Sequence, residues 1–255
     1  MTPSMKVSVI TVVLNNRAYL EDCLQSIFRQ THSPLESIVV DGGSTDGTLN
    51  IVRSHEKRIS RWISEKDRGI YEAMNKGILM ATGEVVGFLN ADDMYFDDRV
   101  VSGIVEAFEP DIDCVYGNLV FVSRSDVDHV TRRWISGDFQ PGLFEKSWTP
   151  AHPTFYCRKS AYDLHGLYRT DFRIAADVEL MYRFLQKHAL RSQFIDRYFV
   201  KMREAGVSTR GLKSTWIITR EMKRAIRDNG GRFRWGRYLF FKLLKIRQIL
   251  QKNKA

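Results

Sequence analysis

The chain has 255 residues, of which 44% are hydrophobic, so it can bury a sizeable core and does not have the composition of a disordered protein. Cysteines at positions 23, 114 and 157 stand singly, which excludes a disulfide framework and paired-cysteine metal sites and favours a reducing compartment. The formal charge is +9, and the 16 Lys/Arg and 3 Asp/Glu of residues 201–255 leave a net −4 for residues 1–200. This basic segment predicts an anionic partner, either a membrane or a nucleic acid.

The first residues do not resemble a targeting or membrane-spanning signal. The run "MTPSMKVSVITVV" lacks a basic leader, a long apolar region and a small-residue cleavage site. Its apolar stretch "VSVITVVL" is too short to cross a bilayer. We therefore expect a cytoplasmic protein whose translation starts at Met1 or Met5.

Strands and helices are predicted to alternate through about the first 95 residues. Runs rich in Val and Ile, or otherwise apolar, predict strands within residues 6–16, 36–41, 59–67 and 84–93. Apolar residues at helical spacing predict helices within residues 18–31, 48–56 and 69–83, the last closed by Gly83. This alternation is typical of a parallel sheet with crossover helices, so the predicted fold class is α/β.

The second half is predicted to be less regular. A helix is expected within residues 100–108, a strand within 114–122, a hairpin through 124–134, a loop-rich stretch with a short strand and helix at 141–166, and a helix at 171–188. Beyond residue 209 the chain is expected to be helical and basic. Because no low-complexity linker is present, we expect a catalytic domain at residues 1–200 and a C-terminal extension at residues 201–255.

Polar clusters follow three of the predicted strands: Asn15-Asn16, Asp41-Gly42-Gly43 and Asn90-Ala91-Asp92-Asp93. In parallel sheets, ligands bind beyond the carboxyl ends of the strands. The convergence of these clusters therefore predicts a ligand site at that edge.

The stretch "VVDGGSTDGT" allows a ligand to approach the backbone closely, and Asp41 can accept hydrogen bonds from a base or ribose. The alternative is a tight turn in which Asp46 or Thr45 caps the next helix. In "EKDRGIYEAMNKG", Arg68 can pair with a diphosphate. The alternative there is an aspartate cap and a surface arginine.

Two adjacent carboxylates, Asp92 and Asp93, stand at the end of a buried strand, where their charges repel and resist burial. A divalent cation, Mg²⁺ or Mn²⁺, would relieve this repulsion and bind a substrate diphosphate. The alternative is a cap for the helix expected near Asp97. In "RIAADVELMYRF", Asp177 or Glu179 can take a proton from an acceptor hydroxyl. The alternative there is two acids favoured by a helix N-terminus.

Taken as an ordered set, "VVDGGSTDGT", "EKDRGIYEAMNKGI" and "GFLNADD" resemble the family 2 glycosyltransferases, which have the GT-A fold. The resemblance runs from about Val7 to Asp93 and from His152 to Phe184, and is closest to bacterial enzymes of exopolysaccharide or O-antigen synthesis. It implies that Thr11, Leu14 and Asn15 line the nucleotide base.

The resemblance also implies that Asp41 contacts the base or ribose, and that Asp67 and Arg68 lie near the ribose and phosphates. Asn90-Ala91-Asp92 occupies the Asp-x-Asp metal position of the family, and Asp177 that of the catalytic base. The first acid of the metal motif is replaced by Asn90, so Asp92 would be the main metal ligand, helped by Asp93. The Gln-x-x-Arg-Trp motif of processive synthases is absent, so we expect one sugar per encounter.

Three further residues are assigned to the acceptor side: His152, Trp148 and Glu179. His152 lies between prolines in a loop between the metal motif and the base, and Trp148 or Tyr156 can stack on a sugar. The alternatives are a histidine packed in a turn fixed by proline, and core aromatic residues.

We therefore expect a metal-dependent transfer of a sugar from a nucleotide diphosphate sugar, UDP-linked, to a saccharide acceptor that is lipid-linked, and the family resemblance implies that the transfer inverts the anomeric configuration. The alternatives are a sugar nucleotidyltransferase, which needs a Gly-rich basic loop that "TVVLNNRAYLED" lacks, and a non-catalytic binding module.

The C-terminal run "RFRWGRYLFFKLLKIRQILQKNKA" mixes bulky apolar residues with Lys and Arg. As a helix, it places Trp235, Tyr238, Phe241 and Leu244 near one stripe, which predicts an amphipathic segment in the interface of an anionic membrane. The alternative is a helix docked on the domain. Nucleic acid is not expected as a partner, because the rest of the chain is net acidic and carries no nucleic-acid motif.

Overall fold

The computed structural model describes residues 5–204, 211–236, 238, 240 and 241. Within these residues, nine strands form one sheet in the order β3-β2-β1-β4-β8-β6-β9-β5, with β7 paired to β6. The strands are β1 Val7–Val13, β2 Leu35–Asp41, β3 Arg61–Ser64, β4 Val85–Phe88, β5 Met94–Tyr95, β6 Cys114–Val122, β7 Val130–Trp134, β8 Tyr156–Arg158 and β9 Ser192–Arg203. The helices are α1 Leu20–Phe28, α2 Thr48–Ser54, α3 Ile70–Met80, α4 Val100–Glu106, α5 Lys159–His165, α6 Ala176–Met181 and α7 Gly211–Asp228.

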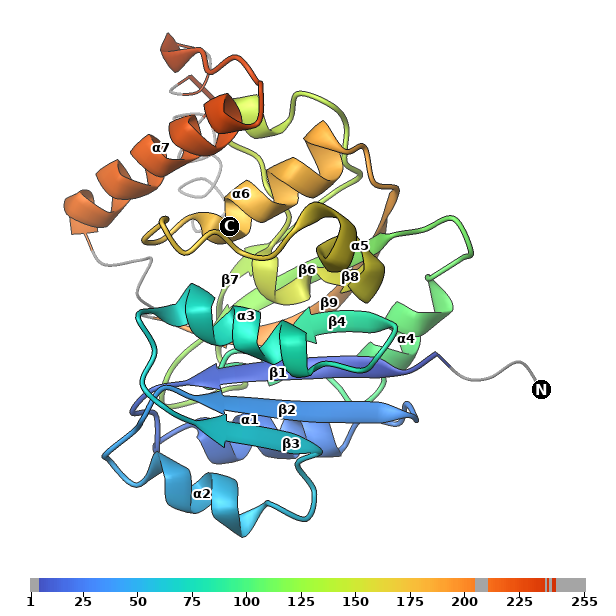
Figure 1. The fold of residues 1–255 in the computed structure, drawn as a ribbon, viewed down its shortest axis with the longest axis vertical. Coiled ribbons are helices and arrows are strands. Elements are labelled where there is room, and N and C mark those ends of the chain that lie inside the picture. The colour runs from blue at the N-terminus through green and yellow to red at the C-terminus, as the bar shows by residue number, and fades with distance from the viewer. Residues whose placement is uncertain (1–4, 205–210, 237, 239, 242–255) are drawn as a thin grey trace.

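The predicted α/β class is confirmed, and its parallel part is the N-terminal half. β1 pairs in parallel with β2 and β4, and β2 pairs in parallel with β3. All seven residues of β1 are buried, because helices cover both faces of the sheet. Figure 1 shows α3 on one face of β1 and β4, and α1 on the opposite face. The carboxyl ends of β1, β2 and β4 therefore open at the same edge.

Two strands were not predicted, and one helix end differs from the prediction. β5 has only two residues, and β9 pairs in parallel with β6 along the sheet. β9 also runs through residue 200, so the expected domain boundary falls inside a strand. α3 ends at Met80 rather than at Gly83, which lies where a Cβ atom would be 2.7 Å from the Ser8 amide nitrogen. Gly83 thus permits close packing rather than closing the helix.

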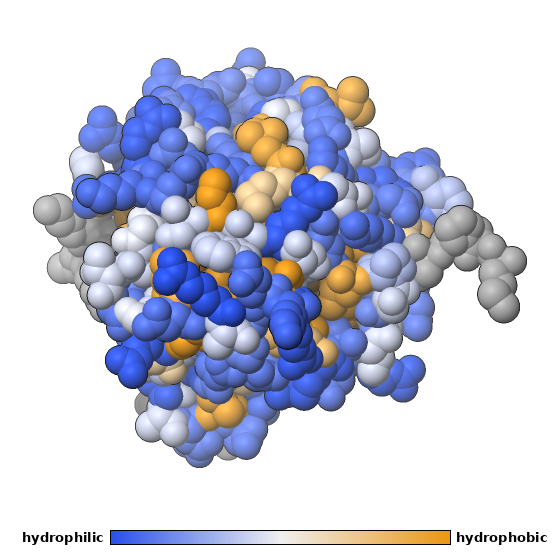
Figure 2. Space-filling model, turned by 60° about the horizontal axis from the view of Figure 1, so that its bottom comes forward, coloured by the Kyte–Doolittle hydropathy of each residue, from blue (hydrophilic) through white to orange (hydrophobic). Residues whose placement is uncertain are grey.

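Within the expected C-terminal extension, the predicted helical character is seen in α7, which packs against α6 (Figure 1). No helix in the described parts of the chain is both long enough and apolar enough to cross a membrane. The predicted interfacial segment is described only as far as residue 241, so Leu244 and the residues after it lie outside the described residues. The face seen in Figure 2 is largely hydrophilic, with hydrophobic side chains in separate patches.

Candidate active site

The Gly-rich loop after β2 is organised by Asp41, whose side chain is fully buried. Its carboxylate accepts the amide N–H groups of Gly43 and Ser44 at 3.2 and 3.1 Å, and the Ser64 hydroxyl at 2.6 Å. Gly43 has a φ of +84°, which a residue with a side chain rarely adopts. The buried Asp41 carboxylate therefore fixes the backbone conformation of the Gly-rich loop.

A second set of contacts joins this loop to the end of β1. The side-chain oxygen of Asn15 accepts the Thr45 amide at 2.8 Å. Asp46 accepts the amides of Arg17 and of Thr48, the first residue of α2, each at 3.0 Å, while the N-cap residue of α2 is Gly47. These contacts fix the two loops to each other at the edge of the sheet.

An unpartnered acceptor lies between these loops and the end of β3. One carboxylate oxygen of Asp67, Oδ2, is buried without a hydrogen-bond partner, while the other pairs with Lys76. Oδ2 would be 3.2 Å from a Cβ atom placed on Gly42, and the Leu14 side chain packs at the same position and is 62% exposed. The exposed Leu14 side chain offers an apolar surface for a flat ring, and beneath it the buried Asp67 oxygen lacks an N–H donor. Arg68 nearby is 89% exposed and pairs with Glu72.

Two residues expected at the nucleotide lie beneath this surface instead. Thr11 is fully buried, with its hydroxyl 3.9 Å from the Cys23 sulfur, so its side chain supports the strand from within the core. Ala91 is 3% exposed and packs in a core cluster with Val13 and Leu20. The assignment of the Thr11 side chain to the base is therefore corrected, because it faces away from solvent, and Ala91 offers only its backbone.

The adjacent acids after β4 occupy opposite environments. Asp93 is 1% exposed. Its Oδ2 accepts a hydrogen bond from the side-chain Nδ2 of Asn90 at 2.9 Å, and its Oδ1 has no hydrogen-bond partner. Burial, and then the charge of Asp92, raises the pKa of Asp93 to about 8. The Asp93 carboxylate is buried, so Asp92 is the more accessible acid of the pair, and the assignment of Asp93 to the metal stays a prediction. Burial and the neighbouring charge of Asp92 both disfavour the ionised form of Asp93.

Asp92 is the carboxylate of the pair that remains accessible. Among the side chains that the structure describes, none hydrogen-bonds to it, while its backbone oxygen accepts from buried Arg203 at 3.0 Å. Within the described residues no group of three His, Cys, Asp or Glu side chains could hold a metal alone. Mg²⁺ and Mn²⁺ are commonly held through one or two carboxylates and substrate phosphates. Asp92, with Asn90 beside it, fits such a partial site.

Asp177 lies in the first turn of α6 and is half-buried. The Tyr71 hydroxyl oxygen, from α3, lies 3.4 Å from its Oδ1 and makes its closer hydrogen bond to the Ile174 carbonyl. Burial raises the pKa of Asp177 above its usual range, and nearby His152 partly offsets this effect. The expected base is thus held against the start of α3.

His152 joins this carboxylate to the end of β4. Its Nε2 lies 2.7 Å from the Tyr168 hydroxyl, and its ring centre is 5.8 Å from that of Phe88, the last residue of β4. Burial lowers the pKa of His152, while Asp177 opposes the shift. Asn75 fixes the Tyr168 segment by accepting its amide at 2.9 Å and donating to its carbonyl at 2.8 Å. His152 is therefore packed in a turn, close to the candidate base.

A cleft of about 420 Å³ opens between the start of α3 and the loop before α6. It is lined by Arg68, Gly69, Ile70, Tyr71, Glu72, Thr170, Asp171, Phe172 and Arg173. Tyr71 is part of this wall and also contacts Asp177, which is not itself among the lining residues.

The remaining acceptor residues are mainly structural. Glu179 is 1% exposed and pairs with Arg183 at 3.1 Å, so its assignment to the acceptor side is corrected: the carboxylate is committed inside the protein. Tyr156 is fully buried and shares a hydrogen bond with Tyr95. Trp148 is half-buried and packs on three aromatic rings: Tyr116, Phe139 and Phe144. The core-aromatic alternative therefore describes Tyr156.

Sequence reasoning missed Tyr71, Tyr168 and Asn75, which hold Asp177 and His152. The sequence signal available was the quoted block "GIYEAMNKG", in which Tyr71 and Asn75 are one helical turn apart and thus share a face. Nothing local marks Tyr168, because its partners are 93 residues away in Asn75 and 16 residues away in His152.

The mostly parallel sheet with flanking helices is the fold of the GT-A class. A profile described as "Glycosyl transferase family 2" matches residues 8–165. A PGL/p-HBAD biosynthesis glycosyltransferase of Mycobacterium bovis is 32% identical over 224 residues, covering 85% of this chain and 82% of its own. The chain belongs to glycosyltransferase family 2.

Solved structures support the same fold. S. aureus TarS 1-349 in complex with UDP-GlcNAc matches with a TM-score of 0.67 at 19% identity, over 87% of this chain and 66% of that chain. Mannosyltransferase PcManGT from Pyrobaculum calidifontis, in complex with GDP-Man and Mn²⁺, matches with a TM-score of 0.65 at 20% identity, over 94% of this chain and 69% of that chain. The match to a longer TarS structure covers 40% of the TarS chain.

Proposed function

We propose that this chain is a metal-dependent, inverting glycosyltransferase that moves a sugar from a UDP-linked donor to a hydroxyl group of a saccharide acceptor. The observation that carries the proposal is the position of Asp177. Its half-buried carboxylate contacts Tyr71 at the wall of the cleft, and burial raises its pKa. A higher pKa makes this carboxylate a stronger base than an ordinary Asp, provided that it is ionised.

The chemistry proposed for Asp177 is a single displacement. Asp177 takes the proton from the acceptor hydroxyl, whose oxygen attacks the anomeric carbon as the bond to the leaving diphosphate breaks. Attack opposite the leaving group inverts the configuration at that carbon. The ion pair of Glu179 with Arg183 supports a single base, because it removes the nearest alternative carboxylate.

The donor base is proposed to lie on Leu14. An N–H group of the base would satisfy the free Oδ2 of Asp67, which is buried and otherwise unpartnered. The TarS complex is named for UDP-GlcNAc and the PcManGT complex for GDP-Man, so uracil and guanine are the two bases to compare.

The metal is proposed to be held by Asp92, with Asn90 as a neutral oxygen donor beside it. A bound Mn²⁺ or Mg²⁺ neutralises charge on a leaving diphosphate. The accessible Asp92 carboxylate supports this assignment, as does the Mn²⁺ named in the PcManGT complex.

The acceptor is proposed to be a lipid-linked saccharide at the inner face of the cytoplasmic membrane, in the synthesis of a cell-surface polysaccharide. In the described part of the C-terminal segment, one aromatic residue packs against the protein while two others face solvent, which supports contact with a membrane surface. Tyr238 is buried, whereas Trp235 and Phe240 are 47% and 58% exposed. Lys223 lies 5.1 Å from the Trp235 ring, which combines a cation with an exposed aromatic surface.

A panel of UDP- and GDP-sugars, incubated with the protein and Mn²⁺, tests the reaction. We expect slow release of free UDP from one UDP-sugar, faster when a saccharide acceptor is present. The Asp177→Asn variant should bind UDP normally but lose transfer, whereas Asp92→Asn should lose the Mn²⁺ dependence of UDP binding. Release of pyrophosphate instead would indicate a nucleotidyltransferase, and no turnover of any donor would favour a binding module.

Sedimentation with anionic liposomes tests the membrane role. The variant Trp235→Ser/Phe240→Ser removes two exposed rings while keeping buried Tyr238, and should lose most liposome binding without losing UDP-sugar hydrolysis. Leu164→Ser is the matched control, because Leu164 is 77% exposed on α5. Binding should also weaken with salt. Failure of the unmodified protein to bind at low salt would leave the docked-helix alternative.

A further inference from the structure

The helix that carries Asp177 has no cap of its own. α6 begins at Ala176, its N-cap residue is Ala175, and no side chain at that position accepts a hydrogen bond. The first N–H groups of a helix have no partner within the helix and need an acceptor from elsewhere. Small polar residues usually supply it, and "RIAA" contains none.

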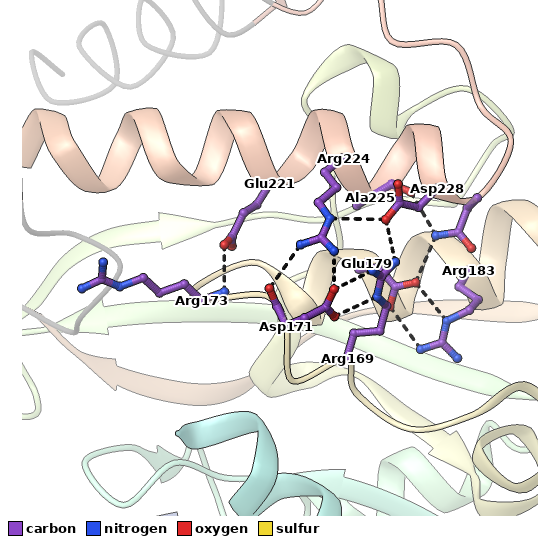
Figure 3. A network of polar contacts seen from close by, with 10 residues as sticks. Arg169, Asp171, Arg173, Glu179, Arg183, Glu221, Arg224, Ala225 and Asp228 are labelled. Atoms are coloured by element: carbon purple, nitrogen blue, oxygen red, sulfur yellow. Dashed lines mark hydrogen bonds and ion pairs between the residues drawn. The ribbon is translucent and has the colours of Figure 1, made fainter. Parts of the chain in front are cut away.

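An acceptor for the backbone that leads into α6 comes from Glu221 on α7. The carboxylate of Glu221 accepts the amide N–H of Arg173 at 2.8 Å through Oε1, and those of Ile174 and Ala175 at 2.9 Å through Oε2. Figure 3 shows the Glu221 side chain reaching from α7 to this turn. One of these amides belongs to the N-cap residue Ala175 and two belong to the residues before it. A carboxylate that accepts several N–H groups makes strong, charge-assisted hydrogen bonds.

α7 is held in register by a second group of contacts one turn further on (Figure 3). Arg169 donates to Asp171 and to Asp228, each at 2.7 Å, and Arg224 pairs with the same two acids. Arg169 and then Arg224 lower the pKa of Asp171 to about 2. Asn229 donates to Glu179 at 3.0 Å. α7, and with it Glu221, is therefore fixed to residues that precede the turn before α6 and to a residue that follows it.

The peptide groups around Ile174 connect Glu221 to the candidate base. The Ile174 amide donates to Glu221, and the Ile174 carbonyl accepts the Tyr71 hydroxyl. Tyr71 is also the residue that contacts Asp177, three positions after Ile174. The backbone at Ile174 is thus held from α7 on one side and from α3 on the other.

We infer that Glu221 is a positioning residue, which fixes the turn before α6 and thereby the orientation of the Asp177 carboxylate toward the acceptor hydroxyl. α7 is then part of the catalytic unit rather than an appendage. The inference rests on the proposed role of Asp177. Its structural part, that Glu221 holds the amides of the turn before α6, can be measured without turnover.

Glu221→Ala and Glu221→Gln, in the full chain, form the test. A displacement of about 1 Å at a catalytic group can cost about 100-fold, so we expect a 10- to 100-fold loss of kcat in the alanine variant. The KM for the UDP-sugar should change less than about threefold, because Leu14, Asp67 and Asp92 lie on other loops. Glu221→Gln keeps one acceptor oxygen and should recover part of kcat. Arg227→Gln is the control, an exposed position on the same helix.

Two measurements separate this inference from a general loss of stability. In an Asp177→Asn background, Glu221→Ala should cost little more, because both changes act through one carboxylate. An equal additional loss in that background, or an unchanged kcat in Glu221→Ala alone, would overturn the inference.

The second measurement does not depend on transfer. Amide hydrogen exchange should accelerate at Ile174 and Ala175 in Glu221→Ala but not in Arg227→Gln. If exchange accelerates while the unmodified protein transfers no sugar, the proposed function fails, but the result still supports the role of Glu221 in fixing the turn before α6. If exchange does not accelerate, the inference fails whatever the activity.

Discussion

Replacing Arg183 by methionine tests how the interior beneath α6 is stabilised. The guanidinium group pairs with both oxygens of Glu179 at 3.1 Å. It also donates to the backbone carbonyls of Gly166 at 2.9 Å and Leu167 at 2.7 Å. Methionine fills similar space but supplies none of these donors. Among the described residues, Glu179, which is 1% exposed, would keep the side-chain amide of Asn229 as its one hydrogen-bond donor.

Removal of one partner from a buried ion pair typically costs about 3–5 kcal/mol, since the other charge stays buried and unpaired. The carbonyls that lose donors place the expected cost toward the upper end of that range. For a chain of this size, 1 kcal/mol shifts the melting temperature by about 2–4 °C, so we expect a fall of roughly 6–20 °C. Adding Glu179→Gln to Arg183→Met removes the orphaned charge and should restore about 0.5–3 kcal/mol.

Urea unfolding is the assay, with the change read from the midpoint at constant slope. UDP affinity serves as the control for an intact donor site. The reasoning would be refuted if Arg183→Met cost less than about 1 kcal/mol, or if Glu179→Gln made the double variant still less stable.

Three further outcomes follow from the site and the sheet. Asp177→Asn should lower kcat by about 10²–10⁴-fold. In the unmodified enzyme kcat should rise with pH through a pKa above that of ordinary Asp, because burial raises the pKa of the base, and pH profiles of kcat should lose this limb in the variant. Asp41→Ala should weaken UDP by about 1–3 kcal/mol in calorimetry, with acceptor affinity unchanged, because the Gly-rich loop loses its central acceptor. Gly87→Ala should destabilise the fold by about 1–3 kcal/mol in thermal unfolding, because the new Cβ would lie 1.9 Å from the Tyr156 ring, whereas Gly137→Ala, with nothing within 4 Å, should not.

The first half of the fold was predictable because its elements are strongly periodic and close to one another in sequence. Apolar runs predicted β1, β2 and β4, and the polar residues that follow these strands predicted a ligand site at their carboxyl ends. β9 escaped prediction because "SQFIDRYFVKMR" contains charged residues and is mostly half-buried, so it lacks the apolar run of a central strand. β5 was too short to give any period.

The chemistry of individual side chains was less predictable than their location. The sequence placed Asp92 and Asp93 together, but only the packing of the chain separates an accessible carboxylate from a buried one. Glu221 gave no local signal either, because the amides that it accepts are 46–48 residues earlier in the chain. Contacts over such separations depend on the tertiary fold, which local propensity does not encode.

The position of β9 in the sheet has a consequence for synthesis on the ribosome. β6 is buried along its whole length, and one of its edges is covered by β9, which ends at Arg203. About 80 residues separate the ends of these two strands, so at typical elongation rates the edge of β6 stays open for about 4–16 s. An open apolar edge pairs readily with other chains. Nascent chains that stall before Ser192 should therefore aggregate or recruit chaperones, whereas chains released after β9 has emerged should not.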